Sequence, residues 1–129
     1  MSIVTIHVEP DRAEADRRSL ERLLEADARY NRGEHVEAED HVSFESIEGL
    51  FATLSPKRLE LLRHVRRHGP ARSVKALAEA LDRDYRRVHD DVVALERIGL
   101  VERDGTALRA PHSEIRFALR LDDEPAVAA

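Results

Sequence analysis

Five side chains in the middle of the chain have types and spacing suited to binding double-stranded DNA. They lie in the run DRDYRRVHDD at residues 82–91. Arginine is the best bidentate donor to guanine, and tyrosine or histidine can reach a phosphate or a thymine methyl group. In the alternative interpretation, the arginines are ordinary surface charges that keep an exposed helix in water, beside neighbouring aspartates. The five residues are Arg83, Tyr85, Arg86, Arg87 and His89.

A pair of short helices is predicted to position these residues. In the stretch 73–98, apolar side chains recur at helical spacing on both sides of the short turn 82–84. A third helix is indicated just before the pair, because Ser55 can cap it, Pro56 suits its first position and Gly69 marks its end. Together the three helices predict a helix-turn-helix. The expected apolar stripes are Val74, Leu77, Ala78 and Leu81, then Val88, Val92, Leu95 and Ile98.

The second helix of the pair is the expected reading helix. If Val88 is at the centre of its buried face, Arg86 and Arg97 lie on the opposite face. Recognition helices present their N-terminal residues to the major groove, so Arg86 would meet DNA first. Further contacts are predicted from Ser73, which caps the first helix of the pair, from Lys75 in its first turn, and from Arg103 in the segment after the pair.

A β-hairpin is predicted directly after the helices. Two short runs, 100–103 and 107–110, flank Asp104-Gly105, and Asp-Gly is a frequent hairpin turn. Three helices followed by a hairpin indicate a winged helix-turn-helix. The predicted fold class is mainly α with small β, with an N-terminal strand-helix arm and a C-terminal strand.

The two ends of the chain each contain an isolated strand pattern. Residues 3–8 and 115–121 alternate as strands do, and neither has a local partner. Unpaired edges can pair with each other or across a two-fold axis with a second chain, and both options stay open. We expect a homodimer in either case. The domains predicted are 1–40 as a dimerisation or partner arm, 41–122 as the winged helix, and 123–129 as a frayed tail.

Charge is distributed unevenly along the 129 residues, whose net charge is −5. Residues 1–54 carry −7, residues 55–110 carry +4 and residues 111–129 carry −2. The only net-basic segment contains the helix pair, as expected if it contacts phosphates. The sequence has no cysteine, no membrane-length apolar run and no leader pattern, which indicates a cytoplasmic protein with no membrane partner.

Catalysis and metal binding are not expected. His64 and His68 have the i, i+4 spacing of a two-histidine metal clamp, but no further ligand completes the set. A solvated basic face is the preferred interpretation of these histidines. No Gly-rich phosphate loop, nucleophile elbow or acid–base pair appears, so we predict that the protein is not an enzyme and needs no cofactor.

From Phe44 to Leu121 the chain resembles a family of MarR-like winged-helix regulators of archaea and bacteria. These proteins are often described as antitoxins of toxin–antitoxin systems. The carrying runs are SFES at 43–46, LSPKRLELLRHV at 54–65, SVKALAEALDRDYRRVHDDVVALERIGLVER at 73–103 and SEIRFALRL at 113–121. The resemblance implies sequence-specific DNA binding, transcriptional control of the protein's own operon and a protein toxin as a further partner.

The function expected from these observations is a dimeric DNA-binding transcriptional regulator. One alternative is a protein–protein interaction module on a winged-helix scaffold, because a fold does not fix a function and the net charge is acidic. A repressor that responds to a small molecule is a third hypothesis, although no sequence feature defines an effector pocket. The sequence does not identify the operator or the sign of regulation.

Overall fold

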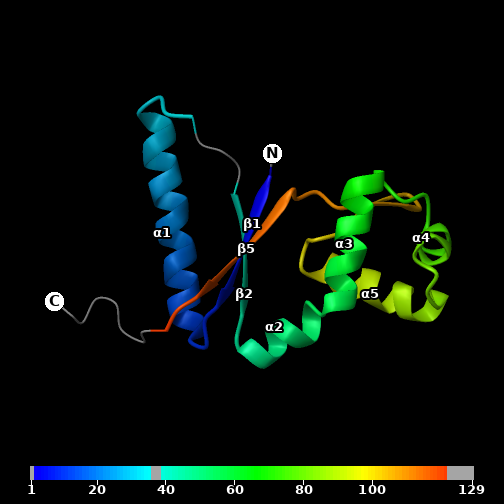
Figure 1. Cartoon of the computed structure of the whole chain (residues 1–129). Helices are drawn as coiled ribbons and strands as arrows, with labels where there is room; N and C mark the ends of the chain where they lie inside the picture. Colours follow the sequence, from blue (N-terminus) through cyan, green and yellow to red (C-terminus); the bar gives the residue numbers. More distant parts are fainter. Residues whose placement is uncertain (1, 36–38, 122–129) are drawn as a thin grey trace. The chain divides into compact units, whose positions relative to one another are not determined.

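The computed structural model of the chain describes residues 2–35 and 39–121. Within these residues the protein is mixed α/β, with five helices and five strands (Figure 1). Contacts along the chain divide it into two compact units. The middle unit comprises residues 51–113, and the sheet unit comprises residues up to 50 together with those from 114 onward. No helix in the described part of the chain is both long and apolar enough to cross a membrane.

The middle unit contains the three predicted helices, α3 (Pro56–His68), α4 (Val74–Leu81) and α5 (Tyr85–Arg97). Their ends follow the predicted signals. The Ser73 hydroxyl accepts a hydrogen bond from the backbone N–H of Ala76 at 3.0 Å, and Ser55 caps α3 in the same way. These bonds satisfy N–H groups that a helix cannot pair internally. At the other end of α3, Gly69 has φ +79°, which only glycine adopts at little cost.

The core of the middle unit is aliphatic. The two predicted stripes meet in it, and only their last members, Leu81 and Ile98, are partly exposed. Burying each large aliphatic side chain contributes about 1.5–3 kcal/mol, so these stripes are the main reason that α4 and α5 pack together. The buried hydrophobic side chains of the unit are Leu54, Leu61, Leu62, Val65, Val74, Leu77, Ala78, Val88, Val92, Leu95, Leu100, Val101, Leu108 and Ala110.

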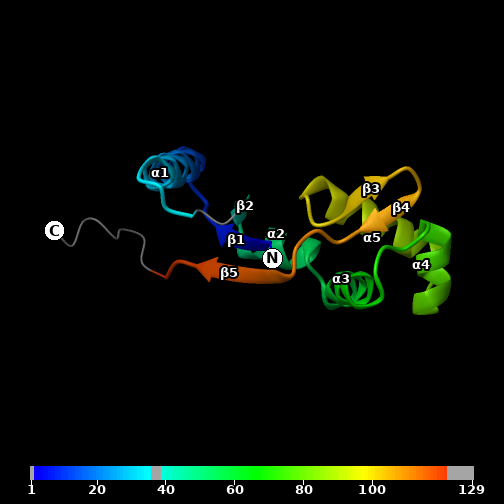
Figure 2. The same ribbon diagram turned by 90° about the horizontal axis from the view of Figure 1, so that it is seen from above.

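The predicted hairpin is confirmed. Strands β3 (Glu102–Asp104) and β4 (Ala107–Arg109) pair antiparallel around Gly105, which has φ +64° (Figure 2). A third segment joins them, because Ala71 and Leu108 exchange two backbone hydrogen bonds of 2.8 and 2.9 Å. The short link between α3 and α4 is thereby tied to the hairpin.

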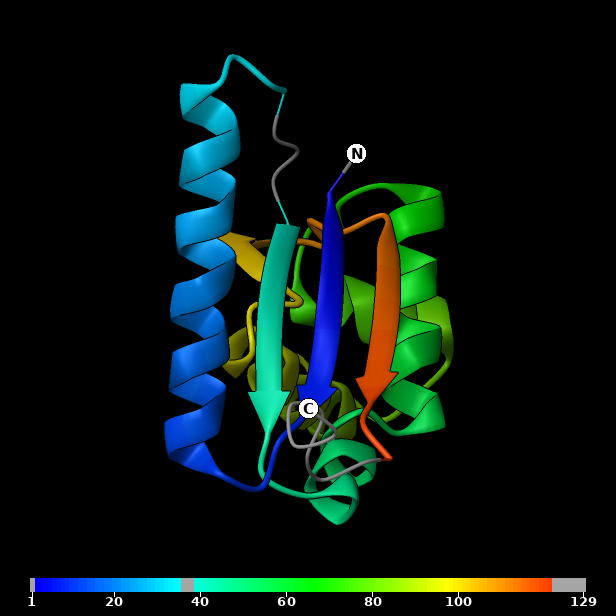
Figure 3. The same ribbon diagram turned by 90° about the vertical axis from the view of Figure 1, so that its left-hand side faces the viewer.

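The sheet unit is built around the N-terminal strand. Strand β1 (Ile3–Val8) lies between β2 (Glu39–Phe44) and β5 (Glu114–Leu119), and both neighbours run parallel to it (Figure 3). The two terminal strands therefore pair within one chain, which is one of the two options left open by the sequence. Helix α1 (Arg12–Asn31) connects β1 to β2, as a parallel pair of strands requires.

The division into units differs from the boundary expected at residue 40. That expectation rested on the acidic run before residue 41 and treated the next residues as part of the winged helix. In the structure β2 begins at Glu39 and pairs with β1 along its length, so residues 39–50 group with the N-terminal strand. Strand β5 groups there for the same reason, and the β content is larger than expected. Helix α2 (Ile47–Thr53) spans the boundary, and the predicted frayed tail, 123–129, lies outside the described residues.

The two faces of the sheet differ in polarity. His7 and His41 lie on the face that carries α1, whereas Val4 and Ile6 point the opposite way and are buried. Helix α1 begins at the cap Asp11 and lies along the sheet (Figures 2 and 3). It has no buried residue. Its large apolar side chains are more than half exposed, namely Leu20, Leu23, Leu24 and Tyr30.

Candidate nucleic-acid interface

The turn between α4 and α5 fixes where the predicted reading helix begins. Asp82 ends α4 in the left-handed conformation, with φ 53° and ψ 51°, and such a residue reverses the chain within one or two positions. Asp84 then caps α5, accepting a 3.2 Å hydrogen bond from the backbone N–H of Arg87. The first turn of α5 consequently starts at Tyr85, as the sequence indicated.

The N-terminal half of α5 presents the predicted side chains to solvent. Arg86 and Arg87 are exposed, and within the described residues no carboxylate forms an ion pair with either. Tyr85 is 53% exposed and its ring is stacked on that of His89, with centroids 6.1 Å apart. Val88, on the other side of the helix, is fully buried. The packing of Val88 fixes the rotation of α5 and leaves the two arginines accessible.

Arg83 does not share this exposed position. Its Nη2 atom lies 2.5 Å from Oδ2 of Asp91, and only 17% of its side chain is exposed. The second carboxylate oxygen of Asp91 accepts a 2.9 Å hydrogen bond from Nε of Arg58. Arg83 was expected to meet DNA beside Arg86, but in the structure its guanidinium is held within the protein. Arg83 and Arg58 together pair with the nearly buried carboxylate of Asp91.

Asp91 forms an ion pair with Arg58 that the sequence did not predict. Its side chain is only 12% exposed. A sequence signal was available, since residue 91 lies three positions after Val88 and four before Leu95, on the buried stripe. Arg58 also donates to the carbonyl oxygen of Thr53 at 2.9 Å. The cluster of Arg58, Asp91 and Arg83 thus connects the start of α3 to the turn before α5.

The remaining predicted contact residues differ in whether their polar groups already have a partner in the protein. Lys75 is exposed, with no ion pair to any described residue, and Ser73 uses its hydroxyl to cap α4. Arg103, on the hairpin, donates through Nε to Glu96 of α5 at 2.9 Å. A neighbouring pair on the hairpin joins Arg109 to Glu102, and this hydrogen bond raises the pKa of Arg109. The Arg103–Glu96 ion pair therefore connects the hairpin to α5. The positive charges of Arg103 and Arg109 are largely neutralised by Glu96 and Glu102.

A shallow depression lies where α4 meets α5. Its lining combines cations and acids, with Lys75, Arg83 and Tyr85 beside Glu79, Asp82 and Asp84. The acids lower the local positive potential, so non-specific attraction to phosphates is expected to be modest. Binding by this surface would depend on specific contacts by the few exposed cations.

The two histidines of α3 form a local contact. The rings of His64 and His68 are stacked with centroids 4.3 Å apart, and His68 Nδ1 lies 3.1 Å from the carbonyl oxygen of His64. Among the residues described, no three histidine, cysteine or acidic side chains form a group that could hold a metal ion.

Comparison with known proteins gave one family. The model of the HVO_A0114 family matches residues 53–117, from the last residue of α2 into β5. The chain belongs to the HVO_A0114 family. The match covers half of the chain, and this half contains the three helices α3, α4 and α5 and the hairpin. Neither the curated proteins nor the solved structures that were compared gave a match. The resemblance to MarR-like regulators lies outside these matches and stays a prediction.

Proposed function

We propose that this HVO_A0114-family protein is a sequence-specific DNA-binding transcriptional regulator. The observation that carries the proposal is that Arg86 and Arg87, on the first turn of α5, are exposed and form no ion pair with any residue that the structure describes. In a helix-turn-helix, that turn enters the major groove and its side chains reach base edges. Arg86 is the proposed base-reading residue, and Tyr85 and His89 are proposed to contact the backbone or a thymine methyl group.

The arrangement of the middle unit supports a winged helix-turn-helix. Three helices precede a two-stranded hairpin, and Ala71, between the first two helices, pairs with Leu108 on the hairpin. Lys75, near the start of α4, is proposed to contact a phosphate from the neighbouring helix. The Arg103 pair with Glu96 supports a role in holding the hairpin, so its contribution to DNA binding is proposed to be secondary.

Titration of the full chain with DNA from upstream of its own gene tests the proposal. We expect a retarded band in a gel-shift experiment, with tighter binding to this DNA than to a scrambled fragment of equal length. Absence of retardation even at low salt would refute the regulator and favour the protein-interaction module, because weak phosphate contacts strengthen as salt falls.

Homodimerisation forms part of the proposal. Two copies would present two reading helices to a palindromic operator. The exposed leucines of α1 support an assembly through the sheet unit, since clustered exposed apolar side chains mark interaction surfaces. Sedimentation of the free protein at micromolar concentration measures the assembly state. If a small toxin-like gene adjoins this one, the proposal extends to an autoregulating antitoxin, tested by co-purification of the two products.

A further inference from the structure

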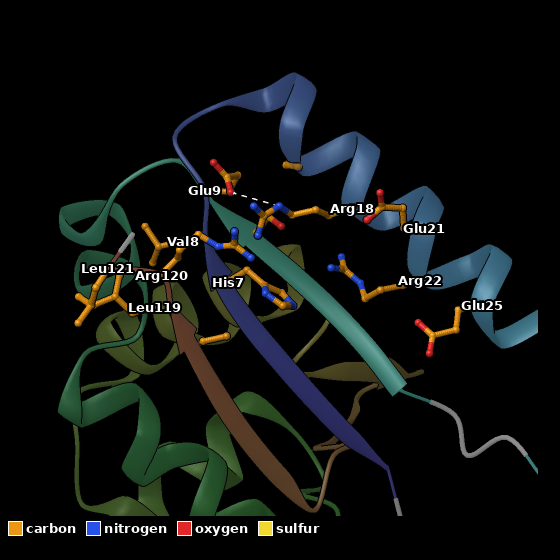
Figure 4. A pocket seen from close by; sticks show the side chains of 13 residues that line it. His7, Val8, Glu9, Arg18, Glu21, Arg22, Glu25, Leu119, Arg120 and Leu121 are labelled. Atoms are coloured by element: carbon orange, nitrogen blue, oxygen red, sulfur yellow. Dashed lines mark ion pairs between the residues drawn. The ribbon is translucent and has the colours of Figure 1, made fainter. Parts of the chain in front are cut away.

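Two cavities lie between α1 and the polar face of the sheet, and Arg22 lines both (Figure 4 shows the first). His7 of β1 belongs to the first cavity and His41 of β2 to the second. The two rings are joined by a 2.8 Å contact between His7 Nε2 and His41 Nδ1 and are stacked 5.0 Å apart. Arg22 and the histidine pair therefore mark the junction of the two cavities.

Arg22 differs from the other arginine of α1 that extends over the sheet. Arg18 is paired with Glu14 at 2.9 Å and lies 3.8 Å from Glu9. Arg22 donates only to the hydroxyl of Ser19, at 3.2 Å, and among the described residues it has no carboxylate within ion-pair distance. Both guanidinium groups extend from α1 toward the strand that carries His7 (Figure 4). Among the described residues, the Arg22 guanidinium is thus a charged donor beside the histidine pair that has no ion-pair partner.

The positive field at this junction affects the histidines. Burial lowers the pKa of His7 to about 4, and the nearby charges of Arg22, His41 and Arg18 act in the same direction. Burial also lowers the pKa of Arg22, Arg18 adds to the effect, and Glu39 opposes it. A bound oxyanion can satisfy a guanidinium group that has no ion-pair partner in a cavity.

A metal cation suits this place less well than an anion. A cation bound by the two histidines would lie near Arg18 and Arg22, and like charges repel strongly in a partly buried site. Acidic side chains also line the cavities, and one of them reaches the junction: Glu39 Oε2 lies 3.9 Å from Nε2 of His41, and the charge of Glu39 partly offsets the lowering of the pKa of Arg22. The charged groups on this side of the sheet include Glu9, Glu25 and Glu39 against Arg18, Arg22 and Arg116.

We propose that the junction binds a small oxyanion, a phosphate or a carboxylate, through the Arg22 guanidinium and Nδ1 of His7, the ring nitrogen that the contact between His7 and His41 does not use. Arginine binds both groups bidentately. Because the bound charge would be negative, it would favour the protonated form of the histidines and draw a proton into the pair. The site belongs to the sheet unit alone, so the proposal holds whether or not the middle unit binds DNA.

Calorimetric titration of the full chain with inorganic phosphate and, separately, with succinate at pH 6.5 tests the site. Saturable binding of at least one anion is expected, and the anion that saturates identifies its chemistry. Replacing Arg22 by Gln should weaken binding about tenfold or more, because a charge-assisted hydrogen bond is lost. Arg12→Gln removes the same charge from an exposed position of the same helix and should leave the affinity unchanged.

A second readout uses the wild-type protein only. The His7 ring proton resonance, followed by NMR against pH, should show a pKa that rises when the bound anion is present. Failure of both anions to saturate, or equal weakening by Arg12→Gln and Arg22→Gln, would overturn the proposal. Binding of Zn²⁺ in preference to both anions would overturn it as well, because the junction would then be a cation site.

Discussion

The Arg83 guanidinium lies 2.5 Å from Oδ2 of Asp91 and joins the turn before α5 to the buried face of that helix. Asp91 therefore holds two arginines, Arg83 and Arg58, at the base of the proposed reading helix. Three charged groups share one partly buried place, and the net charge of the cluster is positive. The arginines of this region therefore divide into two that hold the fold, Arg58 and Arg83, and two that face solvent, Arg86 and Arg87.

Replacing Asp91 by Asn should destabilise the middle unit strongly. The change leaves two partly buried guanidinium groups without their counter-charge, and loss of one partner of such a cluster costs about 3 kcal/mol. Denaturant titration followed by circular dichroism measures the free energy of unfolding. Asp90→Asn is the matched control, because the Asp90 side chain is 70% exposed and should change stability by less than about 0.5 kcal/mol. Equal effects of the two substitutions would contradict the role given to Asp91.

Arg86→Ala and Arg83→Ala should act on different properties. Arg86→Ala is expected to lower affinity for a specific operator by about 1–3 kcal/mol while leaving stability nearly unchanged. Arg83→Ala should lower the unfolding free energy, because it removes one partner of Asp91. Fluorescence anisotropy with operator and scrambled DNA, paired with thermal unfolding, separates the two effects. If Arg86→Ala weakens every sequence equally, Arg86 is not a base reader.

Lys75→Ala should weaken binding to all DNA sequences nearly equally. A lysine that contacts a phosphate does not read the DNA sequence. Without this lysine, binding of the protein releases about one counterion fewer from the DNA. The slope of log affinity against log salt should therefore decrease by about 1. Glu79→Gln, at an exposed position of the same helix, is a useful comparison because it should strengthen binding slightly. An unchanged salt slope for Lys75→Ala would place this lysine away from the phosphates.

Stability of the sheet unit should fall as the pH is lowered from about 6.5 to about 4. His7 has a pKa of about 4 in the folded chain against 6.5 as its ordinary value, so in this window the unfolded chain binds the extra proton. The pKa of His41 is also lowered by burial, which acts with the same sign. His7→Gln should flatten the dependence. Unfolding by denaturant at several pH values, recorded with the Arg22 site free of added anion, measures the slope. A slope that persists in His7→Gln would assign it to other groups.

Local chemistry made the middle unit largely predictable. Two capping serines, Ser55 and Ser73, predict where helices start. Gly69 predicts a helix end and Gly105 predicts a hairpin turn. Each of these residues lies within four positions of the structure that it predicts. The exposure of Arg86 followed from helical periodicity once Val88 was placed in the core. These predictions needed no knowledge of distant contacts.

The sheet unit could not be predicted in the same way. Strand alternation in residues 3–8 shows which side chains share a face but does not identify the neighbouring strand. The partner β5 lies more than a hundred residues away, where Ile3 meets Glu114 in register. The ion pair of Arg83 could not be predicted for a related reason, because the burial of its partner Asp91 depends on contacts with other elements, among them Arg58 of α3. Position on a helix indicates an exposed face, but contacts from other elements decide burial.

The central position of β1 in the sheet has a consequence for the order of folding. During synthesis β1 leaves the ribosome before its neighbour β5, which follows only after the whole middle unit. Closing so long a loop is costly for a flexible chain, but the cost falls if residues 51–113 have already folded and brought their ends into a fixed geometry. We therefore expect the middle unit to act as a folding template, and the sheet to be completed last on the nascent chain.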